Sequence, residues 1–157
     1  MKLGLKYYPQ YKKYSCGPVA LKMVFEHLGI EYSRERMIEL CEAVPKEGTE
    51  HKAIIKEVEN EGLEYIQQEN AEVNDLIKFL ENGYPPIVNY YNPISDCGHY
   101  AVVQGYSSKE EVLYLADPRN GEDYTLSFSK FEELWHDGDN TSRGWCLIVG
   151  REKIVIN

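Results

Sequence analysis

Residues 14–18 read Tyr-Ser-Cys-Gly-Pro and lead directly into an apolar helical stretch, residues 19–28 (Val-Ala-Leu-Lys-Met-Val-Phe-Glu-His-Leu). Cys16 therefore lies where a helix is expected to begin, and Pro18 suits the first turn because its missing N–H is not needed there. The free N–H groups and the positive dipole end of a helix favour a thiolate, the nucleophilic form of cysteine. Gly17 is expected to leave room for a substrate backbone. The stretch predicts a reactive cysteine on a rigid element, and a small buried cysteine is the plainer alternative.

A nucleophilic cysteine needs a base, and the sequence offers four histidines. His99 follows a Gly-containing turn and begins the apolar run His-Tyr-Ala-Val-Val, which is typical of a strand entered from a loop. A side chain at such a strand end is held firmly and remains accessible to substrate. His27 and His51 occur in charged helical stretches and His136 in a polar run, so we expect solvated surface positions for these three.

Asp117 is the candidate group that orients His99. It ends a second apolar run, residues 112–116, and the following Pro118 cannot donate to a sheet and favours an extended Asp117. If residues 99–105 and 112–116 pair as a hairpin, Asp117 lies beside His99 and can fix the imidazole tautomer. A turn-forming aspartate before proline is the alternative interpretation.

The fourth candidate is Gln10, which precedes Cys16 by six residues. A tetrahedral intermediate carries an oxyanion, and a side-chain amide can stabilise it together with the backbone N–H of the nucleophile. A loop of this length can fold back over the start of the helix. A solitary glutamine in a loop is usually solvated, so this assignment depends on the other three residues. Four tyrosines flank Gln10 and either line a peptide groove or pack around the first helix: Tyr7, Tyr8, Tyr11 and Tyr14.

Together these residues resemble the C39 peptidase family, the papain-like cysteine peptidases best known from bacteriocin-processing transporters. The match consists of Gln10, Cys16-Gly17-Pro18, the run from His99 to Val103, and Asp117-Pro118, in an order and at spacings similar to the family's. The resemblance covers nearly the whole chain and implies a papain-like fold. It also implies peptide-bond cleavage after a small residue such as glycine, with Cys16 as nucleophile, His99 as base, Asp117 as orienter and Gln10 as oxyanion donor.

The sequence departs from the best-known members of that family, which are N-terminal domains of ATP-driven exporters that cut after a Gly-Gly leader. It contains no apolar run approaching the roughly 18 residues of a membrane span. It also contains no GxxxxGK[ST] phosphate-binding loop. We therefore expect a free-standing C39-like peptidase domain over residues 1–157, to which the Gly-Gly preference does not transfer safely.

The composition is that of one soluble domain, because 157 residues can bury a single substantial core and no repeat or linker-like segment interrupts them. The first residues do not resemble a secretory signal, so we expect a cytoplasmic protein with free thiols at Cys16, Cys41, Cys97 and Cys146. These cysteines lack the paired spacing of a zinc site, and we expect neither a metal nor another cofactor. The net charge of −9 argues against nucleic acid as a partner. It is compatible with a basic peptide substrate, although solubility alone explains it.

Hydrophobic periodicity predicts helices first and strands afterwards. The helices are expected over residues 18–28, from Ser33 onward, over 50–61, from Val73 to the stop at Gly83, and over 130–135. Ser129 and Glu132 have capping-box spacing at the last of these helices. The strands are expected over residues 87–91, 99–105, 112–116 and 145–149. The predicted fold class is α+β, with the nucleophile helix packed on a mostly antiparallel sheet, which agrees with the papain-like fold that the resemblance implies.

Two functional classes follow from these features. The first is a cysteine peptidase acting on a peptide or protein, which the intact set of four candidate residues favours. The second is a catalytically idle C39-like module that binds a peptide or another partner. A related papain-like acyl transferase, such as phytochelatin synthase, is a further alternative, because hydrolysis and transfer share the same acyl-enzyme.

Overall fold

The computed structural model describes residues 1–138 and 142–157. Its helices are α1 (Cys16–His27), α2 (Arg34–Leu40), α3 (His51–Asn60), α4 (Val73–Glu81) and α5 (Phe128–Leu134). Its strands are β1 (Glu64–Gln68), β2 (Ile87–Asn92), β3 (Cys97–Ser107), β4 (Val112–Asp117), β5 (Gly121–Ser127) and β6 (Cys146–Gly150). The six described strands form one antiparallel sheet in the order β1-β6-β2-β3-β4-β5. The α+β fold class predicted from the sequence is confirmed.

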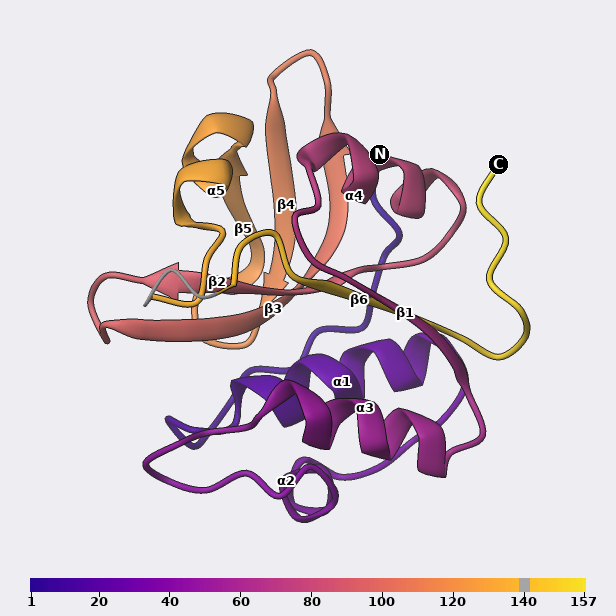
Figure 1. Cartoon of the computed structure of the whole chain (residues 1–157), viewed down its shortest axis with the longest axis vertical. Helices are drawn as coiled ribbons and strands as arrows, with labels where there is room; N and C mark the ends of the chain where they lie inside the picture. Colours follow the sequence, from indigo (N-terminus) through magenta and orange to yellow (C-terminus); the bar gives the residue numbers. More distant parts are fainter. Residues whose placement is uncertain (139–141) are drawn as a thin grey trace.

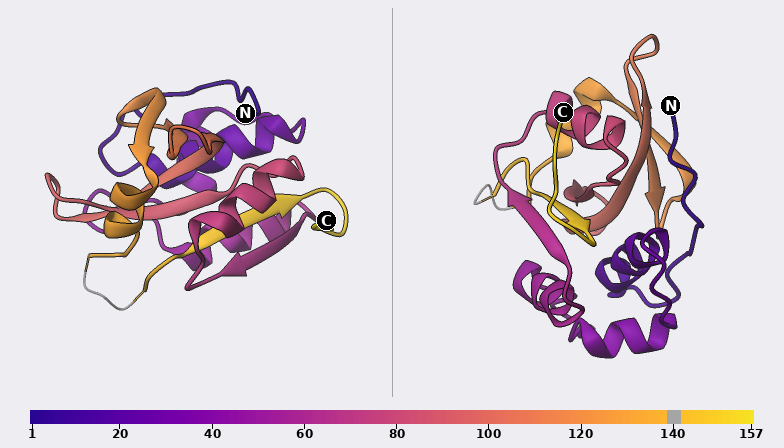
Figure 2. Two further views of the ribbon diagram at one scale, coloured as in Figure 1. Left: turned by 90° about the horizontal axis from the view of Figure 1, so that it is seen from above. Right: turned by 90° about the vertical axis from the view of Figure 1, so that its right-hand side faces the viewer.

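The sheet separates two hydrophobic cores (Figures 1 and 2). Helices α1, α2 and α3 cover one face, and α4 and α5 cover the other. Side chains of β3 alternate between the two cores: Tyr100 and Val102 face the first, whereas Ala101 and Val103 face the second. This alternation explains why β3 reads as an unbroken apolar run in the sequence, because both of its faces are covered.

Helix α1 is the central element of the first core. Its residues from Gly17 to Phe25 are all buried, so the helix is enclosed on every side. The one charged residue in that stretch, Lys22, donates to Glu26 at 2.8 Å and lies 4.1 Å from the centre of the Tyr8 ring. Burial of this helix fixes the position of its first residue, Cys16, against the sheet.

Four features of the predicted secondary structure are wrong or incomplete. Strands β1 and β5 were not predicted, and β1 lies between α3 and α4, so helices do not all precede strands. Ser127 rather than Ser129 caps α5, because the Ser127 hydroxyl accepts the Lys130 N–H at 3.1 Å. Helix α2 begins directly after Ser33, close to the predicted start, and the Ser33 hydroxyl caps it by accepting the Arg36 N–H. Within residues 1–138 and 142–157, no helix is both long enough and apolar enough to cross a lipid bilayer.

Candidate active site

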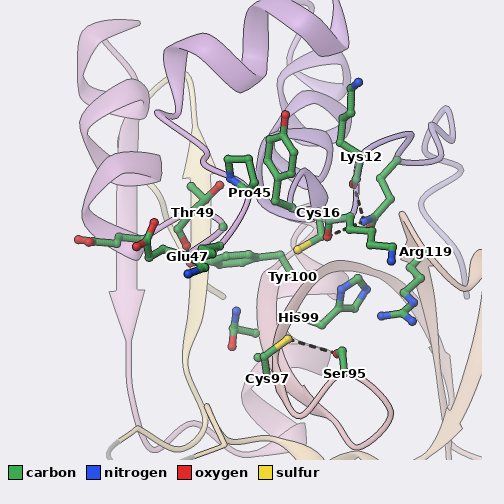
Figure 3. A pocket seen from close by; sticks show the side chains of 18 of the residues that line it. Lys12, Cys16, Pro45, Glu47, Thr49, Ser95, Cys97, His99, Tyr100 and Arg119 are labelled. Atoms are coloured by element: carbon green, nitrogen blue, oxygen red, sulfur yellow. Dashed lines mark hydrogen bonds between the residues drawn. The ribbon is translucent and has the colours of Figure 1, made fainter.

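A cleft of about 1110 Å³ opens where the N-terminus of α1 meets the β2–β3 hairpin (Figure 3). The loop before α1, the loop before α3 and the turn after β4 complete its walls. Three of the four candidate residues predicted from the sequence line this cleft: Gln10, Cys16 and His99. The fourth, Asp117, lies beneath it with no exposed surface.

Asp117 holds His99 from below. Its Oδ1 lies 2.6 Å from Nε2 of His99 and also accepts the backbone N–H groups of Arg119 at 2.9 Å and Asn120 at 3.0 Å. The hydroxyl of Tyr90 donates to the other carboxylate oxygen. The side chains lie together because β3 and β4 pair as the expected hairpin, which brings the end of β4 beside the start of β3.

Cys16 completes a chain of three polar groups. Burial lowers the pKa of His99, but hydrogen bonds to Asp117 and Cys16, together with the negative charges of both, outweigh burial and raise that pKa to about 10. Burial would raise the pKa of Asp117, but the hydrogen bond and charge of His99 bring it below its usual value. Since Nε2 of His99 bonds to Asp117, Nδ1 is the ring atom left for the sulfur. The arrangement favours an imidazolium at His99 paired with a carboxylate at Asp117.

The start of α1 presents unused backbone donors to the cleft. The N-cap residue, Ser15, does not cap the helix with its side chain, and its hydroxyl donates instead to the carbonyl of Lys12 at 2.9 Å. As the first residue of the helix, Cys16 has a backbone N–H with no intrahelical acceptor. A free backbone N–H beside a nucleophile is the kind of donor that can stabilise an oxyanion.

Gly17 has a different role from the one expected. A Cβ at this position would lie 3.1 Å from Cβ of Thr49 and 3.1 Å from the Tyr100 ring. The prediction that Gly17 leaves room for a substrate is therefore wrong. Its missing side chain instead lets α1 begin directly against β3 and the loop before α3.

Gln10 lies beside Cys16, but its amide faces its own loop. Nε2 donates to the carbonyls of Lys12 at 2.9 Å and Lys13 at 3.2 Å, which uses both of its hydrogens. Its Oε1 is buried and has no hydrogen-bond partner among the described residues. An oxyanion-donor role requires one of these two hydrogen bonds to break, and it stays a prediction.

The expectation of a solvated surface position is wrong for His51. Its ring lines the cleft and stacks on Trp145, with centroids 3.9 Å apart and planes within 6°. Nδ1 shares a hydrogen bond with the Tyr100 hydroxyl. Burial lowers the pKa of His51, opposed in part by the charges of Glu69 and Asp137. His51 thus contributes an aromatic, uncharged wall at neutral pH.

The remaining two histidines are His27 and His136. His27 is exposed, as expected, whereas His136 is half-buried and stacks on the ring of Tyr91, with centroids 5.0 Å apart. Neither of them lines the cleft.

The four tyrosines near Gln10 divide between the two roles considered for them. Tyr11 and Tyr14 line the cleft. Tyr8 packs against α1, where its hydroxyl donates to Glu26, and Tyr7 donates to the carbonyl of Asp117 at 2.7 Å. The segment before α1 therefore packs against the elements that carry the candidate residues and also forms part of the cleft surface.

Comparison with known proteins gives the family. The model of the Peptidase_C39 like family matches residues 2–142. This chain belongs to that family. An uncharacterised protein of Methanothermobacter thermautotrophicus is 32% identical over 112 residues, which is 71% of this chain and 70% of that protein.

Solved structures share the fold. The peptidase domain of Streptococcus ComA, a bi-functional ABC transporter of a quorum-sensing pathway, superposes with a TM-score of 0.78 at 25% identity, over 95% of this chain and 100% of that domain. A double glycine motif protease from an AMS/PCAT transporter, solved with its leader peptide, gives 0.75 at 22% identity, over 96% and 94%. A Bacillus anthracis protein described as a C39-like peptidase gives 0.77 at 14% identity, over 97% of each chain. The fold is therefore that of the papain-like C39 peptidase domains.

Within the described part of the chain, no group of three or more histidine, cysteine, aspartate and glutamate side chains is arranged to hold a metal ion. The four cysteines are all unpaired thiols, and only Cys16 and Cys97 reach the cleft.

Proposed function

We propose that this chain is a cysteine peptidase in which Cys16 is the nucleophile, His99 the base and Asp117 the residue that orients the base. The observation that carries the proposal is the buried 2.6 Å hydrogen bond from Nε2 of His99 to Asp117, with Cys16 and His99 lining the same cleft. If Asp117 only shaped the turn before Pro118, nothing would require a histidine between its carboxylate and a thiol that lines the cleft.

In the proposed reaction His99 takes the proton of the Cys16 thiol, and the sulfur attacks the carbonyl carbon of the scissile peptide bond. The resulting oxyanion accepts a hydrogen bond from the backbone N–H of Cys16. The Gln10 amide donates a second hydrogen bond to the oxyanion after it has released one of its two loop carbonyls. His99 then gives its proton to the leaving amine, and the C–N bond breaks to leave a thioester. Water, deprotonated by His99, hydrolyses that thioester and restores the thiol. Asp117 stays ionised throughout and holds the ring in place.

The proposed substrate is a peptide with a small residue, such as glycine, on the acyl side of the scissile bond. This part rests on the likeness to a double glycine motif protease and to the peptidase domain of a transporter. We also propose, from the sequence, that the activity resides in one domain and in the cytoplasm.

Limited alkylation with iodoacetamide at neutral pH tests the assignment of the nucleophile. Cys41 and Cys146 serve as internal controls, because burial raises the pKa of each to about 12. Cys97 is the sharper control, since it is exposed in the same cleft but donates its thiol hydrogen to Ser95 at 3.2 Å. Peptide mapping should show Cys16 as the dominant site. Dominant labelling of Cys97 would refute the proposal.

Profiling with a proteome-derived peptide library, read by mass spectrometry, tests the reaction. We expect cleavage by the wild-type chain after small acyl-side residues. We also expect this cleavage to disappear in Cys16→Ala. A bulky acyl-side preference would overturn the specificity and leave the triad intact. Acyl transfer without net hydrolysis would identify a transferase, and binding without any acylation of Cys16 would identify an idle module.

A further inference from the structure

Asn89 is a polar side chain in an otherwise apolar strand, and it lines the cleft. It lies on β2 directly opposite Tyr100 of β3, so the two side chains share the face of the sheet that packs against α1. Strand β6 pairs with β2 only at Ile87 and Val88. From Asn89 onward, β2 is therefore free of β6 on the side where the cleft opens.

The amide of Asn89 makes no hydrogen bond to any group within residues 1–138 and 142–157, although the residue is only 9% exposed. Asn92, on the same strand and 8% exposed, shows the usual situation, because its Oδ1 accepts the Ile94 N–H at 3.0 Å. Side-chain amides of little-exposed residues usually bond to protein or to water, and the amide atoms of Asn89 are not among the enclosed unpaired ones, so solvent in the cleft reaches them. An amide of this kind that faces a cleft without a protein partner is available to a ligand.

Gly98 makes room for this amide. A Cβ at Gly98 would overlap Oδ1 of Asn89 and would lie 3.2 Å from its Cγ. Gly98 itself lines the cleft immediately before His99. The amide therefore occupies the space above β3 that a side chain at position 98 would otherwise fill, and it lies on the floor of the cleft.

We propose that the Asn89 amide binds the main chain of the acyl half of an extended peptide substrate. A peptide unit offers one N–H and one C=O, and an asparagine amide offers the matching acceptor and donor. The leaving amine must lie over His99 to receive its proton. Asn89 lies on the other side of the site, because it shares a sheet face with Tyr100, which packs against the start of α1 at Gly17. We therefore assign Asn89 to the acyl half of the substrate. This inference rests on the proposed peptidase function.

The test uses the purified chain and two probes. The peptide aldehyde acetyl-Leu-Gly-Gly-H forms a reversible hemithioacetal with the Cys16 thiol, whose hydrogen passes to the aldehyde oxygen, and it occupies only the acyl side because it ends at the scissile carbon. Iodoacetamide reacts with the same thiol and carries no peptide chain. Asn89→Leu replaces the amide with methyl groups of similar shape, and Asn92→Leu is the matched control.

Asn89→Leu should weaken inhibition by the aldehyde about tenfold, for the loss of two hydrogen bonds. It should leave the rate of Cys16 alkylation within about twofold, and its melting temperature should not fall, because no internal hydrogen bond is lost. Asn92→Leu should show the reverse pattern: a lower melting temperature and unchanged inhibition.

Three results would overturn the inference. A melting temperature of Asn89→Leu that falls as far as that of Asn92→Leu would mean that Asn89 is structural. Unchanged inhibition in Asn89→Leu, with wild-type inhibition intact, would remove Asn89 from the site and leave the peptidase proposal standing. Failure of the aldehyde to inhibit the wild-type chain would instead reject the acyl-side preference together with this inference.

Discussion

The main-chain N–H of Gln10 donates to the carbonyl of Pro118 at 2.8 Å. This hydrogen bond joins the loop before the nucleophile to the turn that carries Asp117. The Tyr7 hydroxyl makes a second link, to the carbonyl of Asp117 at 2.7 Å. The two sides of the candidate site are therefore held together by one backbone hydrogen bond and one side-chain hydrogen bond that involve neither Cys16 nor His99.

Gln10→Ala should lower kcat by about 10²–10³ with little change in KM, if the amide stabilises the oxyanion. Its Nε2 bonds to the carbonyl of Lys12 in the free protein, so loss of loop support is the competing effect. Ser15→Ala is the matched control, because Ser15 donates to the same carbonyl without offering an amide. Steady-state kinetics of both variants separate the effects. A change confined to KM would make Gln10 a binding residue, and equal losses in both variants would assign it to loop support.

Asp117→Asn should lower kcat by about 10⁴, because the amide cannot hold the imidazolium as a carboxylate does. Cys16→Ala should lower it by about 10⁶. Asparagine keeps a side-chain oxygen that can accept from the N–H groups of Arg119 and Asn120, which makes it a better test than alanine. Single-turnover measurements on folded variants give the two values. Equal losses would show that Asp117 does more than orient His99.

The folded state should lose stability in alkaline solution through His99. Its pKa rises on folding from 6.5 to about 10, so its protonated form stabilises the fold fully below pH 6.5, and this stabilisation is lost as pH rises through about 10. The pKa of Asp117 shifts in the opposite direction, so its contribution is present above 3.8 and is lost as pH falls. Urea denaturation of wild type and His99→Gln at about pH 6, 8 and 10 measures the first effect. The difference between the two proteins should shrink toward alkaline pH, and a constant difference would contradict the charged pair.

Gly17→Ala should destabilise the protein by about 1–3 kcal/mol, because the new methyl group is forced against Thr49 and Tyr100. It should also slow the alkylation of Cys16, since the start of α1 must shift. Chemical denaturation and the rate of iodoacetamide labelling report the two effects. Unchanged stability would mean that Thr49 and its loop move aside at no cost.

The sequence predicts the elements with covered faces and misses those at the margins of the sheet. Helices α1 to α4 and strands β2, β3, β4 and β6 follow from apolar periodicity, because each buries a face or a stripe in one of the two cores. The missed strands, β1 and β5, are the two edges of the sheet and are mostly polar and exposed. An edge strand next to solvent has little hydrophobic pattern to detect.

The same limit applies within the candidate site. Cys16, His99 and Asp117 stand at element boundaries, where local sequence carries a clear signal. His51 stacks on Trp145, which is far from it in the chain, and a local sequence pattern does not predict a contact of this kind. The sequence does show Asn89 as a polar residue within the apolar run of β2, but the significance of that residue depends on where the pairing between β2 and β6 ends.

Strand β6 is among the last segments of the chain, yet it inserts between β1 and β2. Its Leu147 and Val149 complete the core around α1. Because a ribosome delivers a protein from its N-terminus, the helix that carries Cys16 emerges long before the strand that closes the sheet around it. Until residue 149 has been added, the nascent chain contains Cys16 but lacks part of the core that positions α1. The proposed active site is thus completed only after most of the chain has left the ribosome.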